Sequence, residues 1–145
     1  MALPFLPARR VVLTKSLELH GGTFMTMEDC YQELGGNYVE VCKLLPKPSL
    51  IERFTARFLD DPSFHDLCRE IEAGNRAAAF RAAHTLKGVC ANLSFSRLLA
   101  SVGRLTEVLR PEADTIPDTA VALLEIVRRD YQHTVDTIRE YQGER

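Results

Sequence analysis

Residues 76–93 read RAAAFRAAHTLKGVCANL, and this stretch decides the fold class. Its apolar residues recur every three or four positions, which is the spacing of one face of an α-helix. That face holds Ala79, Ala82, Ala83, Leu86, Cys90 and Leu93. Gly74 ends the preceding segment, and Asn75 can cap the new helix. The stretch therefore predicts a long amphipathic helix with one buried face.

The segment before residue 49 predicts two short helices. Their start and end signals, in chain order, are Thr26 with Asp29, then Gly35-Gly36, then Asn37, and finally Pro46 with Pro48. A side-chain oxygen before a helix satisfies its free N–H groups, glycine ends a helix readily, and proline interrupts one. The second of these short helices is expected to cover residues 38–45.

Three further segments with helical spacing flank the long helix. One follows Ser49, a candidate cap, and is broken at Asp61-Pro62, which resembles a new cap with a first-turn proline. The others cover residues 98–109, before Pro111, and residues 120–138. We find no alternation typical of β-strands. Four main helices that each have a single apolar face can bury those faces only against one another, so we predict an all-α, antiparallel four-helix bundle with short additional N-terminal helices.

Residues 1–24 differ from the remainder of the chain. They contain Pro4, Pro7 and Gly21-Gly22, and they lack the order and length of a signal peptide. We interpret them as an N-terminal arm, either flexible or preceding the natural start at Met25 or Met27, since the periodic sequence begins only there. Residues 25–145 would then form the single bundle domain.

Composition excludes several functional classes. The 145 residues suffice for one domain with its own core, and 46% apolar with 26% charged residues is typical of a globular protein in water. A net charge of −2 offers no strong attraction for nucleic acid, and no apolar run is long enough to span a bilayer.

The cysteines do not form a metal-binding pattern. Cys30, Cys42, Cys68 and Cys90 stand singly, without a second cysteine or a histidine at ligand spacing. Such a pattern argues against a zinc site. In a chain without a secretory signal it indicates reduced core thiols and a cytoplasmic protein.

His84 lies on the opposite side of the long helix from its apolar face. On a helical wheel it shares its side with Ala77, Phe80, Lys87, Gly88 and Ala91, so we expect its imidazole to be exposed. Lys87 and Gly88 follow it by three and four positions and are therefore its surface neighbours. Glycine inside a helix costs about 1 kcal/mol relative to alanine. Gly88 thus suggests that another molecule approaches there, and Lys87 can place a cation near an anion on the ring.

The segment AAHTLKGVCANLS resembles the signature of histidine-containing phosphotransfer (HPt) domains, whose pattern is His-x-Leu-Lys-Gly followed by small residues. The resemblance extends over most of residues 27–141. It implies that His84 is phosphorylated and that Lys87 stabilises the phosphoryl charge beside Gly88. One departure is Ser94, where many relatives have glycine at the end of the active helix.

The resemblance also implies a function. The protein would carry a phosphoryl group in a two-component phosphorelay, accepting it on His84 from a receiver-domain phosphoaspartate or a kinase and passing it to another receiver. Its partners would be response-regulator receivers and a hybrid or sensor histidine kinase. We expect it to bind neither nucleic acid nor a membrane. It would need no cofactor, because the receiver supplies magnesium. Without a nucleotide-binding motif it would not be an autonomous enzyme, and a bundle that uses its apolar faces internally would be a monomer.

We predict that the receiver docks on the surface around His84. This surface would include Gly88, Phe80, Ala91, Arg81 and Ala77. Phe80 is equally compatible with packing beneath a neighbouring element. The remaining histidines, which are His20, His65 and His133, lack a lysine and a glycine one turn later, so we expect them to be solvated side chains without a chemical role.

Two other functions fit the same pattern. One is an adaptor that binds a signalling partner through residues 80–91 without phosphoryl chemistry. The other is a phosphotransfer domain of the chemotaxis kinase type, separated from a larger protein. No linker follows Tyr141, so we favour a stand-alone member of the family.

Overall fold

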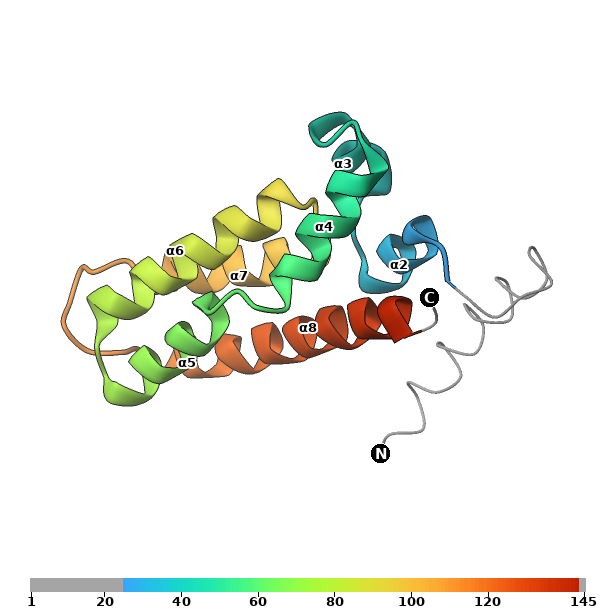
Figure 1. Ribbon diagram of the computed structural model, residues 1–145. Coiled ribbons are helices and arrows are strands. Elements are labelled where there is room, and N and C mark those ends of the chain that lie inside the picture. Colours follow the sequence, from blue (N-terminus) through green and yellow to red (C-terminus); the bar gives the residue numbers. More distant parts are fainter. Residues whose placement is uncertain (1–24, 144–145) are drawn as a thin grey trace.

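The computed structural model describes residues 25–143, and in this range the chain is helical without a β-strand (Figure 1). Its helices are α2 (Met27–Leu34), α3 (Tyr38–Leu44), α4 (Pro48–Phe58), α5 (Ser63–Ala73), α6 (Arg76–Asn92), α7 (Ser96–Val108) and α8 (Asp118–Gly143). The predicted all-α class is confirmed for this range. The predicted N-terminal arm, residues 1–24, lies outside it, and the proposed start at Met25 or Met27 stays a prediction.

The two short N-terminal helices begin and end at the predicted signals. The Thr26 hydroxyl accepts a hydrogen bond from the Asp29 N–H at 3.0 Å, and the Asp29 carboxylate accepts one from the Thr26 N–H at 3.2 Å. This reciprocal cap satisfies two of the free donors at the start of α2. Gly35 ends α2 in the left-handed conformation, with φ 82°. Asn37 caps α3 through its side chain, and α3 stops at Leu44, one residue earlier than expected.

The predicted cap at Ser49 is wrong. Helix α4 already begins at Pro48, and Lys47 occupies the cap position without a side-chain hydrogen bond. Proline is favoured at the first helical position because its fixed φ suits the helix and its missing N–H would have no partner there. The predicted break at Asp61-Pro62 is confirmed, but the predicted cap with a first-turn proline is wrong, because Pro62 itself occupies the cap position and α5 begins only at Ser63. The Asp61 carboxylate still accepts a hydrogen bond from the Ser63 N–H at 2.8 Å.

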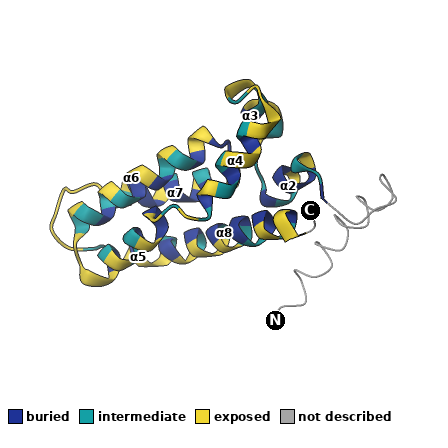
Figure 2. Cartoon of the chain, viewed as in Figure 1, coloured by how far each residue is buried: buried dark blue, intermediate teal, exposed yellow. Residues whose placement is uncertain are grey.

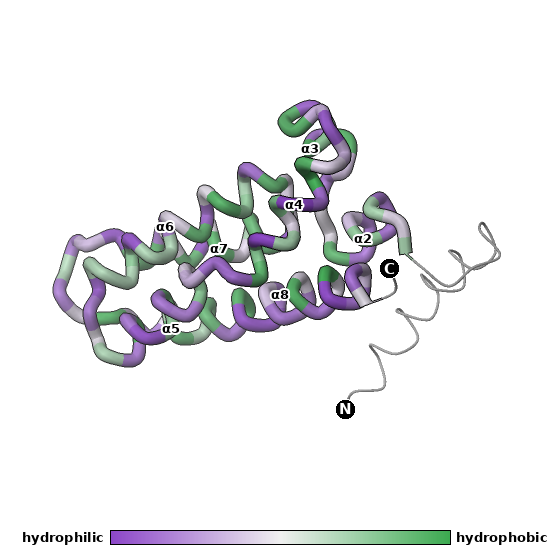
Figure 3. The backbone as a smooth tube through the Cα atoms, in the orientation of Figure 1, coloured by the Kyte–Doolittle hydropathy of each residue, from purple (hydrophilic) through white to green (hydrophobic). Residues whose placement is uncertain are grey.

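The long helices pack along their lengths. Helix α5 lies against α6, α6 against α7, and α7 against α8, while α8 also contacts α5 and α2. In Figure 1 the 26-residue helix α8 runs along the lower side of the molecule beneath α4, and α5 lies at its left end. The helix faces turned toward one another are buried in Figure 2 and largely hydrophobic in Figure 3. The core therefore lies between these helices, and the outer side of α6 remains at the surface.

Aromatic rings connect several helices within this core. The Phe58 ring lies 5.1 Å from that of Phe95 and 5.7 Å from that of Tyr131, measured between centroids. Phe64 stacks on Tyr131 at 4.0 Å, and Tyr31 approaches Phe95 at 5.6 Å. Such pairs stabilise a core beyond the area that they bury. They join α2, α4, α5 and α8 to the turn before α7.

Ser94 occupies the turn after α6 and adopts the left-handed conformation, with φ 55°. Its N–H bonds to the Ala91 carbonyl at 3.2 Å, and the Phe95 N–H bonds to the Cys90 carbonyl at 3.0 Å. This pair of bonds is the helix terminator that glycine usually permits. The departure at Ser94 therefore leaves the turn geometry intact.

Helix α2 and the α2–α3 connection are hydrogen-bonded to this same turn. The Tyr31 hydroxyl donates to the Leu93 carbonyl at 2.7 Å, and burial raises the pKa of Tyr31, which keeps its proton in place. The Asn37 N–H donates to the Ser94 carbonyl at 2.8 Å. A Cβ at Gly36 would lie 2.6 Å from the Tyr31 ring and 2.9 Å from the Ser94 carbonyl oxygen. Gly36 is thus required for the close approach that fixes the end of α6.

Candidate functional site

Helix α6 separates a buried face from an exposed one. Ala79, Ala83, Leu86 and Cys90 are fully buried, as the sequence predicted. Asn75 occupies the cap position, but its side chain does not cap the helix and instead donates a hydrogen bond to the Glu70 carboxylate at 2.9 Å. The alanine-rich sequence favours helix throughout, and it presents His84 on the face opposite the core.

The His84 side chain is exposed, which confirms the first requirement for a surface nucleophile. Its imidazole stacks on the ring of Phe80, one turn earlier, with 6.0 Å between centroids and 22° between planes. Phe80 itself is half-buried. Phe80 also packs against the hydrophobic core, which supports the packing alternative, while receiver docking stays a prediction. In addition, its ring pairs with the imidazole of His84.

Gly88 leaves open space beside the ring of His84. A Cβ built on Gly88 would meet no atom within 4 Å, so nothing in the packing of the fold requires glycine there. Side chains on a helix lean toward its N-terminus. His84 accordingly lies toward Phe80, and the surface on the Gly88 side is unobstructed.

Two charged side chains at the C-terminal end of α7 adjoin the Phe80 end of this surface, Glu107 in the last turn and Arg110 just after the helix. The Arg110 guanidinium lies over the Phe80 ring, 5.6 Å from its centroid, and binds both carboxylate oxygens of Glu107 at 2.9 Å. The hydrogen bonds from Arg110 hold the pKa of Glu107 below its usual value, and the charge of Lys87 contributes to the same shift. Lys87 is half-buried on α6 and thus contributes positive charge near the boundary with α7.

The remaining residues of the predicted docking surface also lie at the protein surface. Ala77, Arg81 and Ala91 are exposed. Together with Phe80, His84, Lys87 and Gly88 they form what we term the outer face of α6, whose exposed positions are visible in Figure 2. The structure therefore brings the predicted site residues onto one continuous helix face.

Of the other histidines, His133 corrects one prediction. Its side chain is only 18% exposed, and its Nε2 lies 2.9 Å from the Glu33 carbonyl oxygen and 3.4 Å from the Glu33 carboxylate. It ties α8 to α2 and is not a freely solvated residue. His65 is exposed as predicted, while His20 lies outside the described residues.

Arg76 has a structural role that the sequence did not reveal. From the first turn of α6 its guanidinium donates to the carbonyl groups of Val108 at 3.1 Å, Arg110 at 2.9 Å and Thr115 at 3.0 Å. It thereby satisfies carbonyls at the end of α7 and holds the loop before α8. A cation at a helix N-terminus opposes the helix dipole, and that local mismatch was the available signal for a distant partner.

The cysteines match their predicted state. All four are free, with Cys30 and Cys90 buried and Cys42 and Cys68 partly buried. Burial raises the pKa of both Cys30 and Cys90 to about 12. Among residues 25–143 no group of histidine, cysteine, aspartate and glutamate side chains could hold a metal ion, and no helix is long and apolar enough to cross a membrane.

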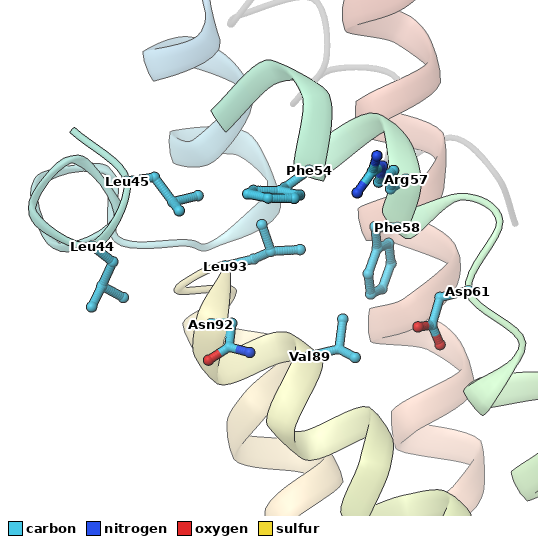
Figure 4. A pocket seen from close by; sticks show the side chains of 9 residues that line it. All are labelled: Leu44, Leu45, Phe54, Arg57, Phe58, Asp61, Val89, Asn92 and Leu93. Carbon is cyan, nitrogen blue, oxygen red and sulfur yellow. The ribbon is translucent and has the colours of Figure 1, made fainter. Parts of the chain in front are cut away.

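A groove of about 420 Å³ lies beside the C-terminal part of α6, away from His84 (Figure 4). Phe54 and Phe58 of α4 form one wall, and Val89 and Leu93 form the opposite wall. Arg57, Asp61 and Asn92 border it with polar groups. No sequence pattern predicted this groove, because it arises where three helices meet.

Comparison with known protein families identifies the class to which this fold and surface histidine belong. The model of the Hpt domain family matches residues 50–140, which is more than half of the chain and includes α5, α6 and α7 in full and most of α8. The chain therefore belongs to the Hpt domain family, whose members act in phosphotransfer within two-component signalling. No match was found among curated proteins or among solved structures.

Proposed function

We propose that this protein is a phosphorelay intermediate that accepts a phosphoryl group on His84 from a receiver phosphoaspartate or a kinase and passes it to another receiver. The observation that carries the proposal is the exposed imidazole on the outer face of α6, with empty space at Gly88 beside it. Membership of the Hpt domain family supports the same chemistry.

The transfer step needs a nucleophile, an in-line approach and stabilised charge. One neutral ring nitrogen of His84 attacks the phosphorus with its lone pair, and the N–P bond forms as the bond from phosphorus to the aspartate oxygen breaks. The bonding electrons remain on the departing carboxylate. The reverse events, with a second receiver aspartate as the attacking group, discharge the histidine. Magnesium at the receiver would neutralise phosphoryl charge in both steps.

The chain's own contribution is positioning and electrostatics. Lys87 would bring an ammonium group toward the phosphoryl oxygens, and Gly88 would admit the backbone of the receiver. No nucleotide-binding motif is present in the sequence. The protein would therefore carry the group without hydrolysing ATP.

We also propose the architecture and setting that the helix packing supports. Helices α4 and α5 together, α6, α7 and α8 would be the four members of an antiparallel bundle, with α2 and α3 as the additional N-terminal helices. The four unpaired cysteines favour a reducing compartment, the cytoplasm. Since the apolar helix faces are used internally, the protein would be a monomer.

A phosphotransfer assay tests the proposal directly. Purified receivers from the same genome, labelled on aspartate with radioactive phosphate, are mixed with wild type, His84→Gln and the matched control His65→Gln, which alters another exposed histidine. Label should move to wild type and His65→Gln and be absent from His84→Gln. It should also be acid-labile and stable in alkali, as expected of a phosphorylated imidazole.

Two results would contradict the proposal. Label retained by His84→Gln would place the acceptor elsewhere in the chain. A wild-type protein that binds a receiver but takes up no label from any of them would favour the adaptor function.

A further inference from the structure

Within residues 25–143, Phe80 is the only aromatic residue whose ring stacks on the imidazole of His84. We propose that Phe80 is a positioning residue that holds the His84 ring in one orientation for phosphoryl transfer. This inference rests on the proposed function. It assigns Phe80 a role different from receiver docking and from packing under a neighbouring helix.

An exposed histidine on a helix would otherwise sample several orientations. The helix backbone restricts its first torsion angle, but the ring torsion is broad. Phe80 covers one side of the ring at 6.0 Å with nearly parallel planes. Gly88 provides no opposing side chain. The imidazole is therefore supported on one side and accessible on the other, which suits a nucleophile that must meet an incoming phosphorus in line.

The supporting ring is itself held from a second helix. Arg110, which follows the end of α7, lies over Phe80, and Glu107 of α7 binds the Arg110 guanidinium through both carboxylate oxygens. The backbone carbonyl of Arg110 also accepts a hydrogen bond from Arg76 at 2.9 Å. Phe80 is thus held between its own helix and the end of α7. A Phe80 ring held in this way can in turn restrict the orientation of the His84 ring.

The size of the effect follows from the strength of aromatic pairs. Such pairs contribute about 0.5–1.5 kcal/mol beyond simple burial, which corresponds to roughly two- to tenfold in a rate constant if the pair selects the reactive orientation. A positioning role lowers the maximal rate constant of transfer. A docking role would instead raise the receiver concentration needed for half-saturation.

The experiment compares wild type, Phe80→Leu and Phe80→Tyr. Leucine keeps apolar bulk and removes the ring, whereas tyrosine keeps the ring and serves as the conservative rescue. Single-turnover transfer from labelled receiver is followed over a range of receiver concentrations. We expect the maximal rate constant of Phe80→Leu to fall by about two- to tenfold with unchanged half-saturation, and Phe80→Tyr to transfer at nearly the wild-type rate.

Proton NMR of the His84 ring provides a readout that does not depend on transfer. The Phe80 ring current should shift the imidazole protons in wild type and in Phe80→Tyr, and this shift should disappear in Phe80→Leu. Circular dichroism confirms that each variant is folded, which is expected because Phe80 is only half-buried.

The outcomes separate this inference from the function on which it rests. Wild-type protein that accepts no label overturns the proposed function together with the positioning role. If wild type accepts label normally, then a Phe80→Leu protein with an unchanged maximal rate constant overturns the positioning role alone. A raised half-saturation concentration without a change in the maximal rate constant does the same, since it identifies Phe80 as a docking contact.

Discussion

The inner and outer faces of α6 differ in which residues they carry and in how those residues pack. On the inner face Ala79, Ala83 and Leu86 are fully buried, and each is a good helix former. On the outer face a glycine stands in the helix interior with nothing to pack against. The inner face is explained by the stability of the fold. No contact within the described residues explains Gly88 on the outer face, and the proposed approach of a receiver would explain it.

The largest expected effect on stability is at Leu86 on the inner face. Leu86→Ala should lower the free energy of unfolding by about 2–5 kcal/mol, because it removes a fully buried side chain and leaves a cavity. Urea denaturation followed by circular dichroism measures this loss. Label uptake per folded molecule should not change, since His84 lies on the other face.

Arg81→Ala is the matched control on the outer face. Arg81 is exposed, so its replacement should change the free energy of unfolding by no more than about 0.5 kcal/mol. Equal losses in Leu86→Ala and Arg81→Ala would contradict the division of α6 into a structural and a functional face.

The next effect is at Gly88, where stability and transfer should change in opposite directions. Gly88→Ala should raise the free energy of unfolding by about 1 kcal/mol, because alanine is the better helix former and its Cβ meets no atom of the fold. Transfer from a receiver should slow by about tenfold, equivalent to about 1.4 kcal/mol in the barrier, because the methyl group occupies the path of approach. Denaturation curves and the single-turnover assay measure the two quantities.

Gly103 on α7 supplies a control for the gain in stability. It is also a helical glycine whose added Cβ would meet nothing within 4 Å, so Gly103→Ala should stabilise the protein by a similar amount. If Gly88→Ala transferred as fast as wild type, the open space beside His84 would have no functional meaning.

The two faces also show how far the sequence could predict this molecule. The burial of Leu86 and the exposure of His84 follow from helical periodicity, so both were predicted correctly. The open space at Gly88 was predictable for the same reason. Each of these features depends on residues within a turn or two of one helix.

Contacts between distant parts of the chain were not predictable in this way. Arg76 bonds to a carbonyl group 34 positions away, and His133 bonds to one 100 positions away. The position of Arg110 over Phe80 likewise requires that α7 pack beside α6. Periodicity shows which face of a helix is buried, but it does not specify the neighbouring side chains.

At the turn that ends α6 only stability should change, and two causes of that change can be measured separately. Ser94 has φ 55°, and its buried hydroxyl has no hydrogen-bond partner among the described residues. Ser94→Gly should therefore raise the free energy of unfolding by about 1 kcal/mol, because the left-handed conformation disfavours a side chain and a buried hydroxyl without a partner is costly. Ser94→Ala removes the hydroxyl but keeps the backbone strain, so it should recover only part of that gain. Urea denaturation of both variants measures the two contributions.

A Ser94→Gly protein less stable than wild type would show that contacts of the serine side chain outweigh the strain. Transfer to His84 should be unchanged in either variant, because the turn retains its hydrogen bonds to Ala91 and Cys90 and lies more than two helical turns from the imidazole.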